Sequence, residues 1–427
     1  MKKIKGIFEN KDLRKKVLFV LLMLLLYKIG THIPVPGIDR DYLKAFTQNT
    51  GLLSFMNTIS GGALANFSIF AVGIMPYITA SIIIQLLQMD IVPKLTEWSK
   101  QGEAGKKKTK VLTRILTVVF ALVQSIAMSV SFGKLYPGLV PGTGFSSYAI
   151  IVISLTIGTI LLMVMGELID KKGIGNGISI LIFAGVISSI PNMAGMFYAS
   201  EFQGSKGNEI AIIKTVLLII CILILVVGII YINQAYRRIA IRYANQGMGN
   251  TSGQVRESYM PIKVNTAGVI PVIFAVAILM FPTTIAQFFP TNKVAIWISN
   301  HLNYHQPLGA TLYVALIVAF SYFYAFVQMN PEKTAKDLRE GGGFIPGYKP
   351  GKPTELFLSG VLSRLTFVGS LFLSAVAILP ILFGYFAGLP QQIQIGGTSL
   401  IIAVGVALDI YQKLDTELKQ KKYRGFL

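Results

Sequence analysis

The sequence predicts an all-α membrane protein with ten transmembrane helices, and three observations support this fold class. Of the 427 residues, 53% are hydrophobic and only 14% are charged, whereas soluble proteins carry about 25% charged residues. Apolar runs of about 20 residues, the length of a helix that crosses a bilayer, recur along the chain. Basic residues are concentrated in alternate segments between these runs, as expected when cytoplasmic loops are basic.

Ten apolar runs are long enough to be spans. They cover about residues 17–33, 73–89, 111–132, 148–167, 177–197, 211–232, 262–288, 309–329, 361–387 and 397–412. The first run follows a basic N-terminus and resembles a signal peptide, but no small-residue cleavage site follows it. We therefore expect this run to be the first span of the mature protein.

Lysine and arginine are divided unequally between the two sets of loops. One set carries 30 of them, in residues 1–16, 90–110, 168–176, 233–263, 330–360 and 413–427. The other set carries five, in residues 34–72, 133–147, 198–210, 289–308 and 388–396. Basic loops stay in the cytoplasm, so both termini should be cytoplasmic. The net charge of +20 would face anionic lipids or acidic partners.

Five spans lie in residues 1–200 and five in residues 201–427. Because five is an odd number, the second half begins on the opposite side of the membrane, so the two halves would form an inverted pair. No clear sequence repeat relates them. Residues 52–71 are too polar and too rich in Gly and Asn to face lipid. We expect a short re-entrant helix there, inside a cavity lined by protein.

Several classes of function lack their characteristic residues. Ion-coupled transporters and membrane enzymes bury ionisable groups in their spans, whereas Glu167, Asp409 and Lys28 lie near span ends, where we expect them to reach the interface. The single cysteine, Cys221, and three scattered histidines argue against a disulfide framework or a metal site. A lipid-modifying enzyme would need an acidic or histidine cluster. We therefore predict neither an enzyme nor a cofactor.

Two glycine-rich segments do not form nucleotide sites. In GEAGKKKT, at residues 102–109, the glycines are three positions apart, whereas a phosphate-binding loop needs five. GIGNG, at residues 173–177, follows a predicted span and no strand. We interpret it as a tight turn in which glycine takes a positive φ angle.

Two long segments resemble the signature segments of the SecY family: SIFAVGIMPYITASIIIQLL at 68–87 and ELIDKKGIGNGISILIF at 167–183. Shorter stretches agree, namely IPVPGID at 33–39, SGGALA at 60–65, KVNTAGVIP at 263–271, FVQMNPEKTA at 326–335 and GGTSLII at 396–402. The resemblance covers nearly the whole chain and is closest to bacterial members, which lie in the plasma membrane.

The resemblance implies a channel that passes unfolded preproteins with signal sequences across the membrane and releases apolar segments laterally into lipid. It implies small membrane subunits of the SecE and SecG type, the SecA motor ATPase and the ribosome as partners. It also implies an hourglass pore between the two halves, closed by a plug at residues 60–70. The alternative is a secondary transporter with inverted repeats, which requires buried ionisable groups.

The resemblance assigns an aliphatic ring to the narrowest point of the pore: Ile74, Ile78, Ile182, Ile273 and Ile402. An apolar constriction loses its water and resists ions. From composition alone the five would be ordinary packing residues. The plug residues are Ser60, Gly61, Gly62, Ala63, Leu64, Ala65, Asn66 and Phe67. The paired glycines would give a hinge, and Gly73 with Pro76 would break the chain before the next span.

The family's lateral gate lies between the second and seventh spans, where Thr79, Gln124 and Asn265 match its polar positions. A buried polar contact between spans contributes about 0.6 kcal/mol, and up to ~2 kcal/mol, so an apolar helix can displace it. Gly268 and Pro271 would bend the seventh span. The alternative is that the three polar residues only stabilise helix packing.

The two large basic loops, 233–263 and 330–360, match the family's docking sites for SecA and the ribosome. The residues concerned are Arg237, Arg238, Arg242, Arg256, Arg339 and Lys349. Basic side chains suit phosphate or carboxylate partners, although the alternative is a role in orientation only. Family members commonly have arginine at the position of Lys349, and lysine cannot make the same bidentate contact.

The charge distribution gives a testable topology. With Cys221→Ser as background, Gly138→Cys and Gly204→Cys should react with a membrane-impermeant thiol reagent in intact cells, because both positions lie in the weakly basic loops. Gly347→Cys should react only after the membrane is opened. Labelling of Gly347→Cys from outside would contradict the ten-span topology.

Overall fold

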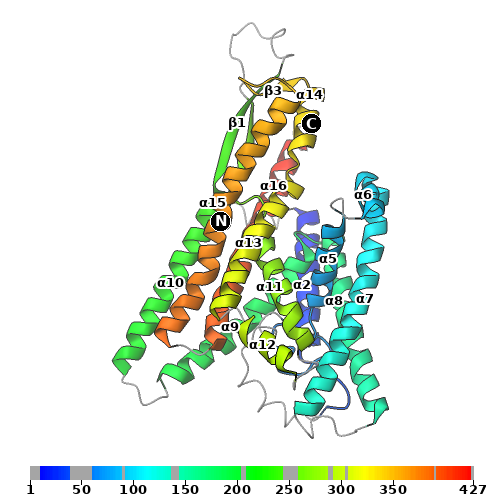
Figure 1. The fold of residues 1–427 in the computed structure, drawn as a ribbon, viewed down its shortest axis with the longest axis vertical. Coiled ribbons are helices and arrows are strands. Elements are labelled where there is room, and N and C mark those ends of the chain that lie inside the picture. The colour runs from blue at the N-terminus through cyan, green and yellow to red at the C-terminus, as the bar shows by residue number, and fades with distance from the viewer. Residues whose placement is uncertain are drawn as a thin grey trace.

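The computed structural model describes residues 10–38, 60–88, 92–135, 144–202, 208–243, 258–286, 292–302, 306–388 and 391–424. Each of the ten predicted spans falls on one helix, in the predicted order. The helices are α2 (Lys11–Gly30), α5 (Met75–Leu87), α7 (Gly102–Leu135), α8 (Phe145–Lys172), α9 (Gly177–Phe202), α10 (Asn208–Gln234), α11 (Ile270–Ala286), α13 (Pro307–Gln328), α15 (Lys352–Ala387) and α16 (Gln391–Arg424). Figure 1 shows these helices running broadly along the long axis.

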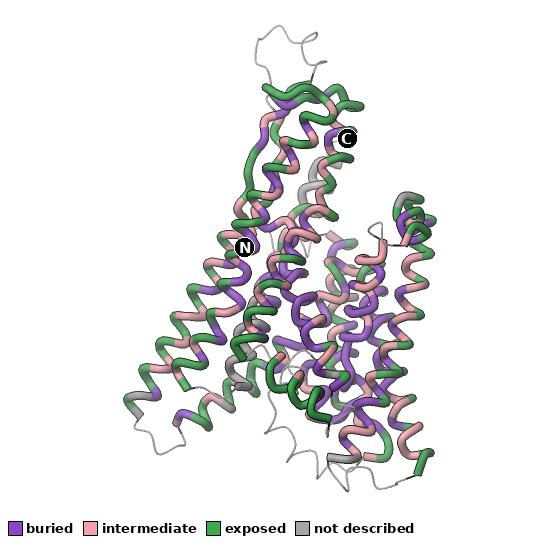
Figure 2. The backbone as a smooth tube through the Cα atoms, in the orientation of Figure 1, coloured by how far each residue is buried: buried purple, intermediate pink, exposed green. Residues whose placement is uncertain are grey.

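The helices have the composition of a membrane-spanning bundle. In the described part of the chain, six helical stretches, on α7, α8, α9, α10, α13 and α15, are long and apolar enough to cross a membrane. Helices α5 and α11 are apolar but shorter. Figure 2 shows buried residues concentrated between helices and exposed residues along their outer sides. On α10, Ile213, Ile224 and Val227 are more than 60% exposed, as suits a surface that faces lipid.

Local sequence signals set several helix ends. The side chain of Asn10 begins α2 by accepting a hydrogen bond from the amide of Asp12 at 3.3 Å. Between α8 and α9 the glycine-rich segment forms the predicted tight turn, in which Gly175 has a φ angle of +101°. Asp170 accepts a hydrogen bond from the amide of Gly177 at 2.7 Å, so a carboxylate lies at the N-terminus of α9, where it is stabilised by the helix dipole.

A small antiparallel sheet joins the two large loops, and it was not predicted. Its strands are β1 (Tyr236–Tyr243), β2 (Ser258–Lys263) and β3 (Gly343–Phe344), in the order β2-β1-β3. Ile239 and Ile262 pack from the sheet against Leu358 and Leu362 of α15. The short helices α6 (Pro93–Lys100), α12 (Lys293–His301) and α14 (Pro331–Glu340) are further additions. Figure 1 places the sheet and α14 together at one end of the molecule.

The seventh predicted span, residues 262–288, begins later than expected. Strand β2 occupies its start, a turn follows, and α11 begins only at Ile270. Gly268 has a φ angle of +66° within that turn. Pro271 lies in the first turn of the helix, where a missing amide hydrogen is tolerated. The predicted bend at these two residues is therefore wrong, because they start the helix.

Candidate functional site

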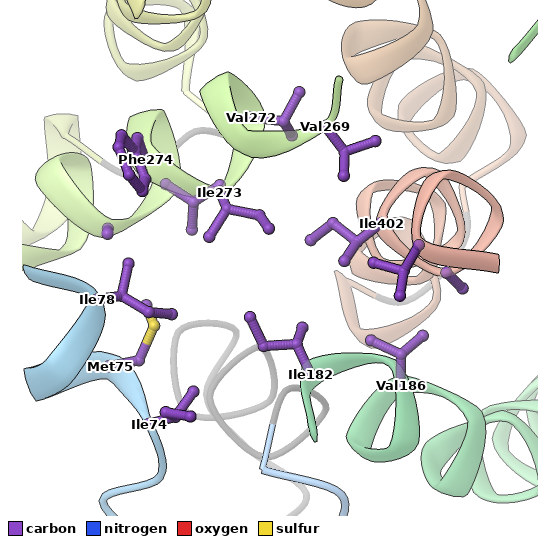
Figure 3. Packing of buried hydrophobic residues seen from close by; sticks show 14 of the residues in the cluster. Ile74, Met75, Ile78, Ile182, Val186, Val269, Val272, Ile273, Phe274 and Ile402 are labelled. Carbon is purple, nitrogen blue, oxygen red and sulfur yellow. The ribbon is translucent and has the colours of Figure 1, made fainter. Parts of the chain in front are cut away.

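The five isoleucines assigned to the ring are buried in one apolar cluster. Their exposed fractions run from 1% for Ile402 to 9% for Ile273. Ile74 immediately precedes α5, Ile78 lies on α5, and Ile182 lies on α9, while the other two lie on α16 and α11. Figure 3 shows Ile78, Ile182, Ile273 and Ile402 pointing toward a common centre, with Ile74 beside them. The structure thus brings together residues that are distant in sequence.

The same cluster contains apolar residues that were not singled out from the sequence. They are Met75, Val186, Val269, Val272 and Phe274 (Figure 3). Two of them lie one helical turn from a ring isoleucine, because Val186 follows Ile182 by four positions and Val269 precedes Ile273 by four. This spacing could have identified both valines from the sequence. None of these side chains carries a strong hydrogen-bonding group, so the centre of the bundle offers water few partners.

The predicted plug has a different local structure from the one expected. Residues 60–74 form consecutive turns and not a helix, while residues 51–59 lie outside the described residues. Gly61, Gly62 and Gly73 have φ angles of +67°, +89° and +69°, which favour glycine. The chain then enters α5 at Met75, so Pro76 lies in the first turn of the helix and not before it.

Side chains of the plug segment are packed against the first half of the chain. Leu64 and Phe67 are each 2% exposed and lie in a cluster with Phe132 of α7 and Leu155 of α8. The rings of Phe67 and Phe132 meet edge to face, with centroids 5.4 Å apart. Ala63 is fully buried in the same cluster as the five isoleucines. The segment therefore contacts both the first half and the isoleucine cluster.

Backbone hydrogen bonds also hold the plug segment. The amide of Val35 donates to the carbonyl of Phe67, and the amide of Ile69 donates to the carbonyl of Ile33, both at 3.0 Å. On the other side, Gly158 of α8 lies so close to the Ile69 carbonyl that a Cβ atom at this position would overlap it. The backbone here is thus fixed on two sides.

The three predicted gate residues do not form one network. Thr79 donates back to the carbonyl of Met75 on its own helix at 3.1 Å. Asn265 lies in the turn before α11, and its Nδ2 donates to Oδ1 of Asn233 at the end of α10 at 2.9 Å. Oε1 of Gln124 is buried without a hydrogen-bond partner among the described residues. Phe120 of α7 contacts the second half directly, because its ring meets that of Phe281 on α11.

Two buried carboxylates are paired with basic side chains. Glu167 accepts a hydrogen bond from Nε of Arg114 at 2.8 Å, and Nζ of Lys110 lies 3.7 Å from it. The side chain of Glu167 is 8% exposed, while those of Arg114 and Lys110 are 42% and 38% exposed; the expected position of Glu167 at the membrane interface stays a prediction. Glu201 pairs with Lys214 at 3.0 Å. In the described residues, no three His, Cys, Asp or Glu side chains gather into a candidate metal site.

The predicted docking residues gather at the sheet. They are exposed on β1, α14 and the segment after β3, and comprise Arg237, Arg238, Arg242, Arg339 and Lys349. Arg256 lies outside the described residues. Arg242 is paired in register with Phe344 of β3, so the sheet places a basic residue of one loop beside a segment of the other. This juxtaposition was not predicted.

The family model of SecY matches residues 68–411. The chain belongs to the SecY family. A relative in Bacillus subtilis (strain 168), protein translocase subunit SecY, is 53% identical over 428 residues, which cover 100% of this chain and 99% of the relative. The ten helices and the signature segments are thus those of a SecY-family bundle.

Solved structures show the same fold at low identity. One described as the structure of a protein conducting channel has a TM-score of 0.65 and 21% identity, over 95% of this chain and 92% of that chain. Sec61 in the canine ribosome-channel complex from the endoplasmic reticulum has a TM-score of 0.62 and 20% identity, over 95% of this chain and 92% of that chain.

The tight contact at Gly158 gives a prediction for this SecY-family chain. Gly158→Ala should displace residue 69 and destabilise the protein by about 1–3 kcal/mol through overpacking. Gly360→Ala is the matched control, because it also lies in a helix and its Cβ would meet nothing within 4 Å. That variant should be neutral or more stable by up to about 1 kcal/mol. Thermal unfolding in detergent compares them, and equal midpoints would contradict the tight contact.

Proposed function

We propose that the protein is the central pore-forming subunit of a protein-conducting channel, which passes unfolded preproteins across the plasma membrane and releases apolar segments laterally into lipid. The observation that carries the proposal is the buried cluster of five isoleucines, four on helices α5, α9, α11 and α16 and one immediately before α5. A hydrophobic constriction excludes water and ions. It also offers no specific bond to a passing chain, so the sequence of that chain matters little.

In this proposal residues 1–200 and 201–427 are the two halves around the pore, and residues 60–67 are the plug. Support for the plug comes from its position, since Ala63 lies in the isoleucine cluster. Leu64 and Phe67 anchor the same segment on α7 and α8. A plug that moves must break these apolar contacts, which fits a seal that is closed at rest.

The proposed partners follow from two surfaces. The exposed basic residues on the sheet and α14 suit the phosphates of a ribosome or the carboxylates of a SecA-type motor, and both termini would lie on that side. The exposed apolar surface of α10 suits lipid or small membrane subunits of the SecE and SecG type. We also propose signal sequences and anionic lipids as partners.

A secondary transporter is less well supported. Such a protein needs ionisable groups near the middle of the membrane to bind its substrate or ion. Glu167 and Glu201 are the buried acids among the described residues, and each has a basic partner near a helix end. Neither belongs to the isoleucine cluster.

The ring assignment is tested by replacing an apolar side chain with a polar one that has the same number of heavy atoms. Ile78→Asn and Ile273→Asn should give water a hydrogen-bond partner, wet the constriction and favour the open state. We expect several-fold higher secretion of a reporter with a defective signal sequence and higher ion conductance in bilayers.

Ile78→Leu and Ile273→Leu are the matched controls, because they change shape and not polarity. They should stay close to wild type in both measurements. If the Asn variants accumulate normally and yet leave secretion and conductance unchanged, these isoleucines do not form the constriction.

A further inference from the structure

One side-chain hydrogen bond joins α5 to α13 across the line where residues 1–200 meet residues 201–427. The hydroxyl of Tyr324 donates to Oε1 of Gln85 at 2.8 Å, although the residues are 239 positions apart. Gln85 lies in the last turn of α5 and Tyr324 near the last turn of α13. We call the interface between residues 1–200 and residues 201–427 the seam. Both helices end toward predicted cytoplasmic loops, so the bond lies near the cytoplasmic end of the seam.

Each partner is positioned by its own half of the chain. Nε2 of Gln85 donates to the hydroxyl of Ser81, one turn earlier on α5, at 3.0 Å, which leaves the amide oxygen to accept from Tyr324. The ring of Tyr324 packs edge to face on Phe274 and Phe323, with centroids 5.2 and 5.9 Å apart. Because both groups are held before they meet, little side-chain entropy is lost when the bond forms.

Two other contacts between the halves, made by α5 or α7 with α11, are apolar. Phe120 of α7 meets Phe281 of α11 with ring centroids 6.0 Å apart, and Ile78 and Ile273 share the isoleucine cluster. An apolar contact in a membrane is readily exchanged for lipid tails or for an apolar helix. A hydrogen bond is not exchanged in this way, since hydrocarbon can neither donate nor accept. The bond between Gln85 and Tyr324 therefore forms only while the seam is closed, and it is lost when apolar groups enter between the two helices.

We propose that the hydrogen bond between Gln85 and Tyr324 is a latch that holds α5 against α13, and that an apolar segment opens this seam by separating the two groups. The proposal rests on the proposed function, because it requires a seam that opens. It assigns the polar contact of the gate to a pair on the second and eighth spans. Thr79 and Asn265, by contrast, bond within their own halves.

Tyr324→Phe tests the latch, because it removes the hydroxyl and keeps the ring. Tyr322→Phe is the matched control, since the Tyr322 hydroxyl donates to the carbonyl of Ser363 at 3.3 Å inside the second half. Loss of a contact between spans of typical strength shifts an equilibrium about threefold. We therefore expect Tyr324→Phe to raise secretion of a signal-defective reporter about threefold, and Tyr322→Phe to leave it unchanged.

A double-mutant cycle then tests whether the two groups act as a pair. Gln85→Met should have the same effect as Tyr324→Phe, and the double variant should equal either single variant. Equal secretion by Tyr324→Phe and Tyr322→Phe, or a double variant that multiplies the single effects, would overturn the latch. If Gln85→Met does not accumulate, the comparison of the two tyrosine variants decides.

A second reporter, with an intact signal sequence, separates the latch from the proposed function. It is expressed in cells whose own channel subunit has been depleted and replaced by this chain. Export of this reporter by the wild-type chain supports the channel function whatever the tyrosine variants do. Failure to export it would overturn the channel function and with it the latch, whereas normal export with no effect of Tyr324→Phe would overturn the latch alone.

Discussion

The apolar junction between α5, α9, α11 and α16 is the constraint on which the rest of the structure depends. Helices far apart in sequence each place an aliphatic side chain there, and the most enclosed, Ile402 and Ile182, are 1% and 2% exposed. Because the junction is apolar, most polar groups on the helices find their partners within their own helices or at helix ends, and Oε1 of Gln124 is an exception among the described residues. Buried hydroxyls do so by donating to the carbonyl one turn earlier, as Thr117 does to Thr113 at 2.7 Å.

Charged groups follow the same constraint. A buried carboxylate is tolerated only with a partner, and both buried carboxylates have one. Glu167 is held by α7 near the end of α8. Glu201 pairs with Lys214 across the connection from α9 to α10, where residues 1–200 meet residues 201–427. Apolar contacts thus form the centre of the bundle, ion pairs join helices near their ends, and the Gln85–Tyr324 bond joins the two halves.

The spans were predictable because an apolar run of sufficient length has few other stable structures. The partners of single polar groups were not predictable, because they are far away in sequence. Arg114 is distant from Glu167, and Tyr324 is distant from Gln85. Strand β1 was missed although the buried Ile239 and Ile241 are two positions apart and are flanked by exposed Arg238 and Arg242, because this basic segment was interpreted only as a loop. The turns at residues 60–74 depend on tertiary packing that composition cannot show. The five isoleucines were selected by family resemblance. Packing alone would not have distinguished them from the other buried apolar residues of the bundle.

The sheet connects the basic surface to the isoleucines by short paths. Strand β1 directly follows α10, β3 precedes α15, and β2 leads through one turn into α11, whose first turn carries Ile273. Nζ of Lys263 at the end of β2 donates to Gln412 of α16 at 2.6 Å, the helix that carries Ile402. Strand β2 is thus one turn from the helix that carries Ile273 and is hydrogen-bonded to the helix that carries Ile402.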